Sequence, residues 1–209
     1  ALVFYIIFRV IMILAVRPAS WAIEKYGLRR CMLLSNILVI CYFSLLYLSK
    51  LNLWIVWIAP IAGGLVVPFY WLPYHLIVSE DSDDRWFGKE VSFLKLINRS
   101  AEVLSPVLGG LLISSLGYPA LFLVIIFFFL VSFFPLSVMQ HHTIHKSFKL
   151  KEVLRGIFKT ERSREWVSLF SAGAHDMVES FVWVFLMFAI LGGEKQLGIL
   201  KSASTVLMV

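Results

Sequence analysis

The chain has 209 residues, of which 60% are apolar and only 15% are charged, and its mean hydropathy is +0.86. Soluble globular domains carry about 25% charged residues, so the composition excludes that class and predicts an all-α, polytopic bundle of membrane helices. The net charge of +6 does not indicate nucleic-acid binding, because the basic residues flank apolar runs and membrane topology accounts for them. We therefore expect the lipid bilayer as a partner and no nucleic acid.

Apolar runs of about 20 residues, the length of a spanning helix, recur along the whole chain. They predict seven spans, the last one incomplete, at residues 1–22, 29–49, 53–77, 91–114, 118–138, 166–191 and 197–209. We expect a fragment of a longer protein, because the chain begins without Met and ends within an apolar run. No signal peptide is recognisable. Cys31 and Cys41 would lie about 15 Å apart on one helix, too far for a disulfide, so we expect them to be packing residues.

The distribution of Lys and Arg between the loops predicts the orientation of the spans. Placing residues 23–28 in the cytoplasm places 79–90 and 139–165 there as well. With this assignment twelve basic residues lie inside, ten in these loops and Arg29 and Arg30 at the edge of the first, and only Lys50 and Lys195 lie outside. Because basic residues collect on the cytoplasmic side of membrane proteins, the imbalance favours this orientation. We expect the plasma (inner) membrane as the location.

Two arginines lie in the first expected span. Arg17 is close enough to the cytoplasmic end for its long side chain to reach the interface. Arg9 lies deeper, where a charge is costly unless it is paired or faces water. Arg9 could bind an anionic solute or pair with Glu102 or Glu179 of other spans. Placement at the membrane interface is the alternative.

A polar turn follows this span, at residues 20–30, and carries one acid, three bases and a glycine. Its characteristic residues are Ser20, Glu24, Lys25, Gly27, Arg29 and Arg30. They resemble the loop between the second and third helices of major facilitator superfamily transporters, which reads Gly, three residues, Asp, a base, one residue, Gly and further bases. Ser20, Glu24 and Leu28 depart from that pattern. The resemblance implies a cytoplasmic gating loop in which Gly27 permits the turn.

The resemblance also implies an architecture of two six-helix halves, of which this chain would contain the second to eighth helices. Residues 1–138 would belong to the N-terminal half, 139–165 would form a cytoplasmic linker, and 166–209 would begin the C-terminal half.

The span 53–77 is rich in Pro and Gly, at Pro60, Gly63, Gly64, Pro68 and Pro73. This density predicts a kinked or interrupted helix, a feature found where transporters bind and open. Tyr70 and Tyr74 could then face a solute cavity, with His75 beside them. An aromatic belt at the cytoplasmic interface is the alternative.

The span 91–114 contains a second motif, Ser105-Pro106-Val-Leu-Gly109-Gly110. It resembles the Gly-Pro-x-x-Gly-Gly end of the fifth-helix motif in proton-coupled antiporters of the superfamily, with Ser105 replacing Gly. Pro removes a backbone hydrogen bond and paired Gly residues allow close helix approach, so we expect a packing role. Ordinary small-residue packing is the alternative, because the upstream glycines of the motif are missing.

The same span carries Arg99 and Glu102, three residues apart on one helix face. Glu102 lies near mid-membrane, where an unpaired charge is costly. An ion pair with Arg99 would lower this cost, and the pair could be structural or could hold a proton-coupled switch.

The segment 139–165 is the only long polar stretch. Between Phe148 and Phe158 apolar residues recur near helical spacing, with basic residues around them. This pattern is typical of a helix lying on the membrane surface. A solvated linker helix is the alternative. His141, His142 and His145 have no Cys or carboxylate set beside them, so we expect no metal site.

The span 166–191 carries His175, Asp176 and Glu179, followed by Trp183. With α-helical geometry His175, Glu179 and Trp183 would line one face, and Asp176 an adjoining edge. Titratable groups inside a membrane helix indicate a proton relay or a site for a cation or solute. Alternatively, His175 and Asp176 lie near the cytoplasmic interface.

Together these features predict a secondary active transporter that moves a small solute by alternating access, with protons as the candidate coupling ion. The candidate solute or ion residues are Arg9, Arg99, Glu102, His175, Asp176 and Glu179. Arg9 favours an anionic solute and the acidic residues favour a cation, so the substrate stays open. We expect a monomer without cofactor.

Two alternatives come from other classes of protein. One is a transporter-like receptor or scaffold, and the other is a membrane enzyme that uses His175 and Asp176 on a lipid. No phosphate-binding glycine loop, Ser/His/Asp set or Cys-x-x-Cys pair appears. We therefore expect that the protein is not an enzyme.

Overall fold

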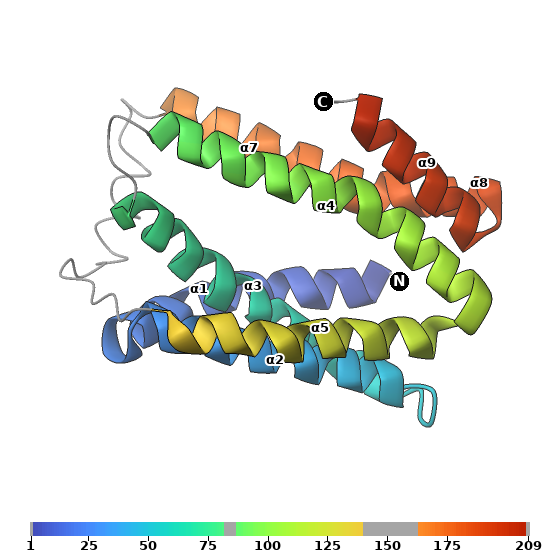
Figure 1. Ribbon diagram of the computed structural model, residues 1–209, viewed down its shortest axis with the longest axis horizontal. Helices are drawn as coiled ribbons and strands as arrows, with labels where there is room; N and C mark the ends of the chain where they lie inside the picture. The colour runs from blue at the N-terminus through green and yellow to red at the C-terminus, as the bar shows by residue number, and fades with distance from the viewer. Residues whose placement is uncertain (1, 82–86, 140–162, 208–209) are drawn as a thin grey trace. The chain divides into compact units, whose positions relative to one another are not determined.

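The computed structural model in Figure 1 describes residues 2–81, 87–139 and 163–207. Within these ranges helices are joined by short turns, and no residue lies in a strand. The helices are α1 (Leu2–Tyr26), α2 (Leu28–Leu48), α3 (Ile55–Asp81), α4 (Phe87–Leu116), α5 (Tyr118–Val138), α7 (Ser163–Met177), the π-helix η2 (Val178–Trp183), α8 (Val184–Leu191) and α9 (Glu194–Leu207). The predicted all-α class is confirmed.

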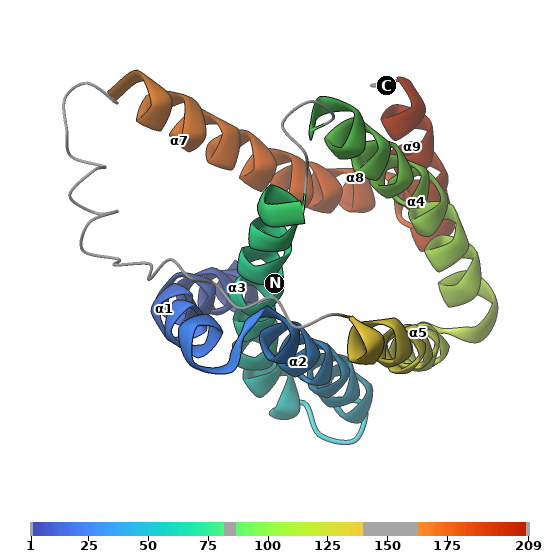
Figure 2. The same cartoon turned by 60° about the vertical axis from the view of Figure 1, so that its left-hand side comes forward.

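Five of these helices, α1 to α5, are long and apolar enough to cross a membrane. Each coincides with one of the first five predicted spans. The sixth predicted span corresponds to α7, η2 and α8, which follow one another as a continuous helical run (Figure 2). The helix α9 begins the seventh.

The described helices divide into two compact units. Unit 1 comprises Ala1–Ser92 and Tyr118–Ser147, and unit 2 comprises Phe93–Gly117 and Phe148–Val209. Unit 1 thus contains α1, α2, α3 and α5, whereas most of α4 belongs to unit 2 with α7, η2, α8 and α9.

Unit 1 is organised around α3, which packs against both α1 and α2, while α2 also packs along α5 (Figure 1). The buried residues of α1 include Ala15, Ala19 and Ala22, which recur at i, i+4 and i+7 and so lie on one face. Small residues allow close backbone approach, which drives helix association in membranes. The larger apolar side chains are mostly exposed, as expected for surfaces that face lipid.

Glycine is required where α1 and α3 touch. A Cβ atom at Gly64 would lie 2.7 Å from the carbonyl oxygen of Phe8, and one at Gly63 would lie 2.9 Å from the Phe8 ring. At Gly64 a side chain would collide with the backbone of α1, and at Gly63 the rings of Phe8 and Tyr42 would have to move. The two glycines that predicted a break in the span therefore form a helix contact.

The span 53–77 is not interrupted, and the alternative of a kinked helix stays a prediction. The helix α3 continues from Ile55 to Asp81 through Pro60, Pro68 and Pro73. Each Pro removes one backbone donor, and the packing of α3 against α1 and α2 supports the helix around these losses.

The turn after α1 is shorter than the expected loop 23–28. The helix α1 continues to Tyr26 and α2 begins at Leu28, so Gly27 alone lies between them. Gly27 has φ 81°, a left-handed conformation that glycine adopts without steric cost. Its amide still donates to the Ile23 carbonyl at 2.9 Å, and the charged residues on either side therefore lie on helical turns.

Candidate functional site

The turn at Gly27 holds its basic residues in different environments. The Lys25 ammonium lies 4.8 Å from the centre of the Trp21 ring and 5.4 Å from that of Tyr26, within the range of cation–π attraction. The Arg29 guanidinium donates to the backbone carbonyl of Ser137, near the end of α5. Arg29 thus ties the predicted gating loop to a helix more than a hundred residues further along the chain.

Arg99 and Glu102 form the predicted ion pair on α4, with 2.8 Å between Nη1 and Oε2. Both side chains are more than half exposed within the described structure, at 57% and 56%. Glu102 is about 22 Å along the helix axis from Phe87, since each residue rises 1.5 Å. The pair therefore lies near the middle of a helix that is long enough to cross the membrane.

Two polar residues extend this pair into a stripe. Lys95 and Asn98 precede Arg99 and Glu102 at spacings of three and four residues, and all four side chains are exposed. Such spacing places them on one face of α4. The sequence analysis missed Lys95 and Asn98, although their spacing from Arg99 and Glu102 was the available signal.

The motif at residues 105–110 packs against α9. A Cβ atom at Gly198 would collide with the carbonyl oxygen of Pro106 and would lie 3.6 Å from the Cα atom of Gly110. A Cβ at Gly109 would meet nothing within 4 Å. The Ser105 hydroxyl donates to the Ala101 carbonyl within α4. Pro106 and Gly110 of the motif thus contact α9, and the residue that this contact requires to be glycine is Gly198.

The acidic span contains a π-helical segment that the sequence did not predict. His175 and Asp176 lie in α7 and Glu179 lies in η2, which extends to Trp183. A π-helix bonds residue i to i+5, so the i+4 step from Glu179 to Trp183 does not close one turn. The expected single face through His175, Glu179 and Trp183 assumed α-helical geometry throughout, and it stays a prediction. π-Bulges occur frequently at functional sites.

A basic residue of α9 lies opposite this segment. Lys201 is half-buried and, together with Trp183 and Ser204, lines a small cavity of about 10 Å³. The sequence analysis overlooked Lys201, although a Lys within an expected span was a sufficient signal. His175 is exposed.

Arg9 interacts with its own helix. Its Nε donates to the Tyr5 hydroxyl at 2.8 Å, and the guanidinium carbon lies 4.9 Å from the centre of the Tyr5 ring. Arg9 belongs to unit 1, whereas Glu102 and Glu179 belong to unit 2. Its predicted pairing with either carboxylate stays a prediction.

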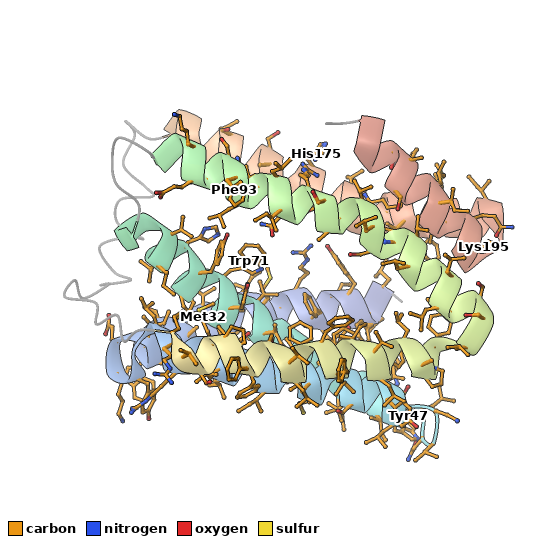
Figure 3. All side chains as sticks on the ribbon, viewed as in Figure 1. Met32, Tyr47, Trp71, Phe93, His175 and Lys195 are labelled. Carbon is orange, nitrogen blue, oxygen red and sulfur yellow. The ribbon has the colours of Figure 1, made fainter. Side chains whose placement is uncertain are left out.

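The aromatic residues of α3 form a connected ladder. Tyr70 stacks on Tyr74 with centroids 6.0 Å apart, and Trp71 stacks on His75 at 5.5 Å. Edge contacts join the two stacks, and Trp71 projects from the helix (Figure 3). Tyr70, Trp71 and His75 are exposed, which suits a solute-facing surface and an interfacial belt alike.

Among the described residues no group of three His, Cys, Asp or Glu side chains could hold a metal ion. The histidines 141, 142 and 145 and the amphipathic segment 148–158 lie outside the described residues.

The family model for the Major Facilitator Superfamily matches residues 2–209 of this sequence. The chain belongs to the Major Facilitator Superfamily. The family resemblance stated from the sequence is thereby confirmed, and the protein is an integral, multi-pass membrane protein of the transporter type, whose family members carry small solutes. Searches of curated proteins and of solved structures gave no match.

The sequence analysis also missed a buried polar contact between two of the membrane helices of this superfamily member. The Asn36 amide donates to the Phe129 carbonyl and the Ser132 hydroxyl, both at 2.9 Å, and so joins α2 to α5. The neighbouring Ser35 hydroxyl donates to the Val66 carbonyl of α3 at 3.2 Å. Neutral polar residues are common in apolar spans, and nothing in the sequence identifies their partners.

Proposed function

We propose that the protein is a secondary active transporter that moves a small solute by alternating access, with protons as the coupling ion. The observation that carries this proposal is the Arg99–Glu102 pair midway along α4, with both side chains more than half exposed. A charged side chain is too costly to face lipid at that depth. The polar stripe of α4 is therefore expected to line a water-filled path or a solute site.

Other residues have supporting roles in this proposal. Asp176 and Glu179 are candidate proton acceptors at the change from α-helix to π-helix, and His175 precedes them on α7. Arg9 on α1 is a candidate contact for the solute, as is the aromatic ladder of α3. The solute itself stays open, because basic and acidic candidates favour opposite charges.

The remaining features concern the movement of helices. Ser20, Glu24, Lys25, Gly27, Arg29 and Arg30 would form the cytoplasmic gate, in which the Arg29 bond to Ser137 holds one closed contact. Ser105, Pro106, Gly109 and Gly110 would shape packing that changes between the two states. Residues 1–138 and 166–209 would belong to the two halves, joined by the linker 139–165. We propose a monomer without catalytic activity.

Flux measurements on Glu102 test the proposal. In proteoliposomes that contain the full-length protein, Glu102→Gln should lower solute-dependent proton movement by about tenfold or more, because it removes the proton acceptor of an intramembrane pair. Glu90→Gln is the matched control, since Glu90 is an exposed acid in the first turn of the same helix. It should leave the flux unchanged.

Glu179→Gln should produce a loss of similar size if the π-helical segment contains the coupling site. Solute binding measured in detergent, compared with flux in proteoliposomes, distinguishes a transporter from a receptor that binds solute without moving it. If the wild-type protein binds solutes yet moves neither solute nor proton, the protein is a receptor or scaffold and the transport proposal is wrong. If flux persists in both variants, proton coupling at these carboxylates is excluded.

A further inference from the structure

A groove opens on unit 1 beside the turn at Gly27. Its volume is about 370 Å³, within the range of about 300–1,000 Å³ typical of small-molecule sites. Trp21 and Tyr26 of α1 form one wall, and Arg30 and Leu34 of α2 form the other. The groove thus lies where two apolar helices reach a charged turn.

The floor and the rim of this groove differ in exposure. Cys31 and Phe69 on the floor are 2% and 8% exposed, whereas Trp21 and Leu34 on the rim are 55% and 41% exposed. The floor is therefore part of the packed core, and the rim consists of large apolar side chains that are open to their surroundings. Such a surface suits an extended hydrocarbon chain.

The charged end of the groove is basic. Arg30 lines it, and the Lys25 ammonium lies over the rings of Trp21 and Tyr26, both of which line the groove. Arg29 points elsewhere, because it donates to the Ser137 carbonyl of α5. Glu24 is the acid of this turn, and it is outnumbered by Arg30, which lines the groove, and Lys25, which lies beside two of the lining rings. Trp and Tyr are typical of the level of lipid headgroups.

We propose that this groove binds one anionic phospholipid. An acyl chain lies along Leu34 and Trp21 above the Cys31 and Phe69 floor, and the phosphate lies between Arg30 and Lys25. Two observations favour a lipid over a soluble anion: the groove is almost wholly apolar apart from Arg30, and it lies on helices long enough to cross a membrane. Basic pockets between membrane helices recognise anionic headgroups in the same way. The proposal shares Arg30 and Lys25 with the proposed gate, but its test measures lipid retention and does not depend on solute transport.

Native mass spectrometry of the full-length protein in detergent tests the headgroup contact. We would titrate dioleoyl phosphatidylglycerol against dioleoyl phosphatidylcholine, which has the same acyl chains and no net charge. The wild type should retain the anionic lipid in preference. Arg30→Gln should reduce that preference about fivefold, the contribution of one basic residue near an anionic surface. Lys50→Gln, at an exposed base beyond the other end of α2, should leave it unchanged.

A second pair of variants tests the acyl contact. Leu34→Trp enlarges a rim residue and should weaken retention of both lipids. Ile37→Trp makes the same change at an exposed position of α2 that does not line the groove, and it should have no effect. Both positions are exposed, so neither variant should disturb folding, which thermal melting of the purified protein would verify.

Four results would overturn the proposal. The first is equal retention of the two lipids by the wild type, and the second is retention that Arg30→Gln and Leu34→Trp leave unchanged. The third is displacement of the anionic lipid by millimolar glycerol 3-phosphate, which would identify a site for a soluble anion. The fourth is complete absence of bound lipid from the wild type.

Discussion

Asn36 shows how much a single polar side chain can contribute inside the bundle. It is 4% exposed, its amide donates to α5 twice, and its Oδ1 accepts a bond from the Ser132 hydroxyl at 3.2 Å. Hydrogen bonds between membrane helices contribute about 0.6–2 kcal/mol each. Asn36→Ala should therefore lower the free energy of unfolding by about 1 kcal/mol, measured by titrating denaturant into the protein in mixed micelles.

Ser137→Ala is the control for this prediction. The Ser137 side chain is exposed and its hydroxyl donates to the Phe134 carbonyl of its own helix, so its loss should have little effect. The double variant Asn36→Ala/Ser132→Ala should lose less stability than the sum of the single changes, because they break a shared bond. Additive losses would show that the two side chains do not interact.

At the scale of elements, the contacts between helices depend on single glycines. Gly64→Ala would place a Cβ 2.7 Å from the backbone carbonyl of Phe8, and α1 would have to shift. Overpacking of this kind costs about 1–3 kcal/mol, so we expect a lower melting temperature. Gly109→Ala has open space and replaces Gly by a better helix former, worth about 1 kcal/mol. It should be neutral or stabilising, and a ranking in the opposite order would contradict the α1–α3 contact.

The elements themselves were predictable, because the polar backbone of an apolar segment must satisfy its own hydrogen bonds inside a bilayer and so forms a helix. The first five predicted spans coincide with α1 to α5, and the i, i+3 spacing correctly paired Arg99 with Glu102. Contacts between distant segments were not predictable. The sequence could not reveal that Gly64 touches α1 or that Asn36 meets Ser132, since nothing local specifies the partner. The π-helix at Glu179 was not predicted either, because nothing in the residue types of 178–183 distinguishes it from an α-helix.

At the scale of the whole molecule, the position of the basic residues predicts which side of the membrane each turn occupies. The turn between α2 and α3 contains one base, Lys50, whereas the segment 139–165 contains many. Since basic residues stay in the cytoplasm, the first should lie outside and the second inside. The same assignment puts the Gly27 turn, with its proposed gate and lipid groove, on the cytoplasmic side.

Cysteine labelling would establish this orientation. In a background in which Cys31 and Cys41 are replaced by Ala, we would introduce Asn52→Cys in the exposed outer turn and Ser147→Cys in the linker. A membrane-impermeant maleimide should label Asn52→Cys in intact cells and Ser147→Cys only after permeabilisation. Both changes remove a neutral residue and so leave the charge distribution intact. The reverse labelling pattern would show that the orientation is the opposite one. The gate and the lipid groove would then face the outside, away from the anionic lipids of the cytoplasmic leaflet.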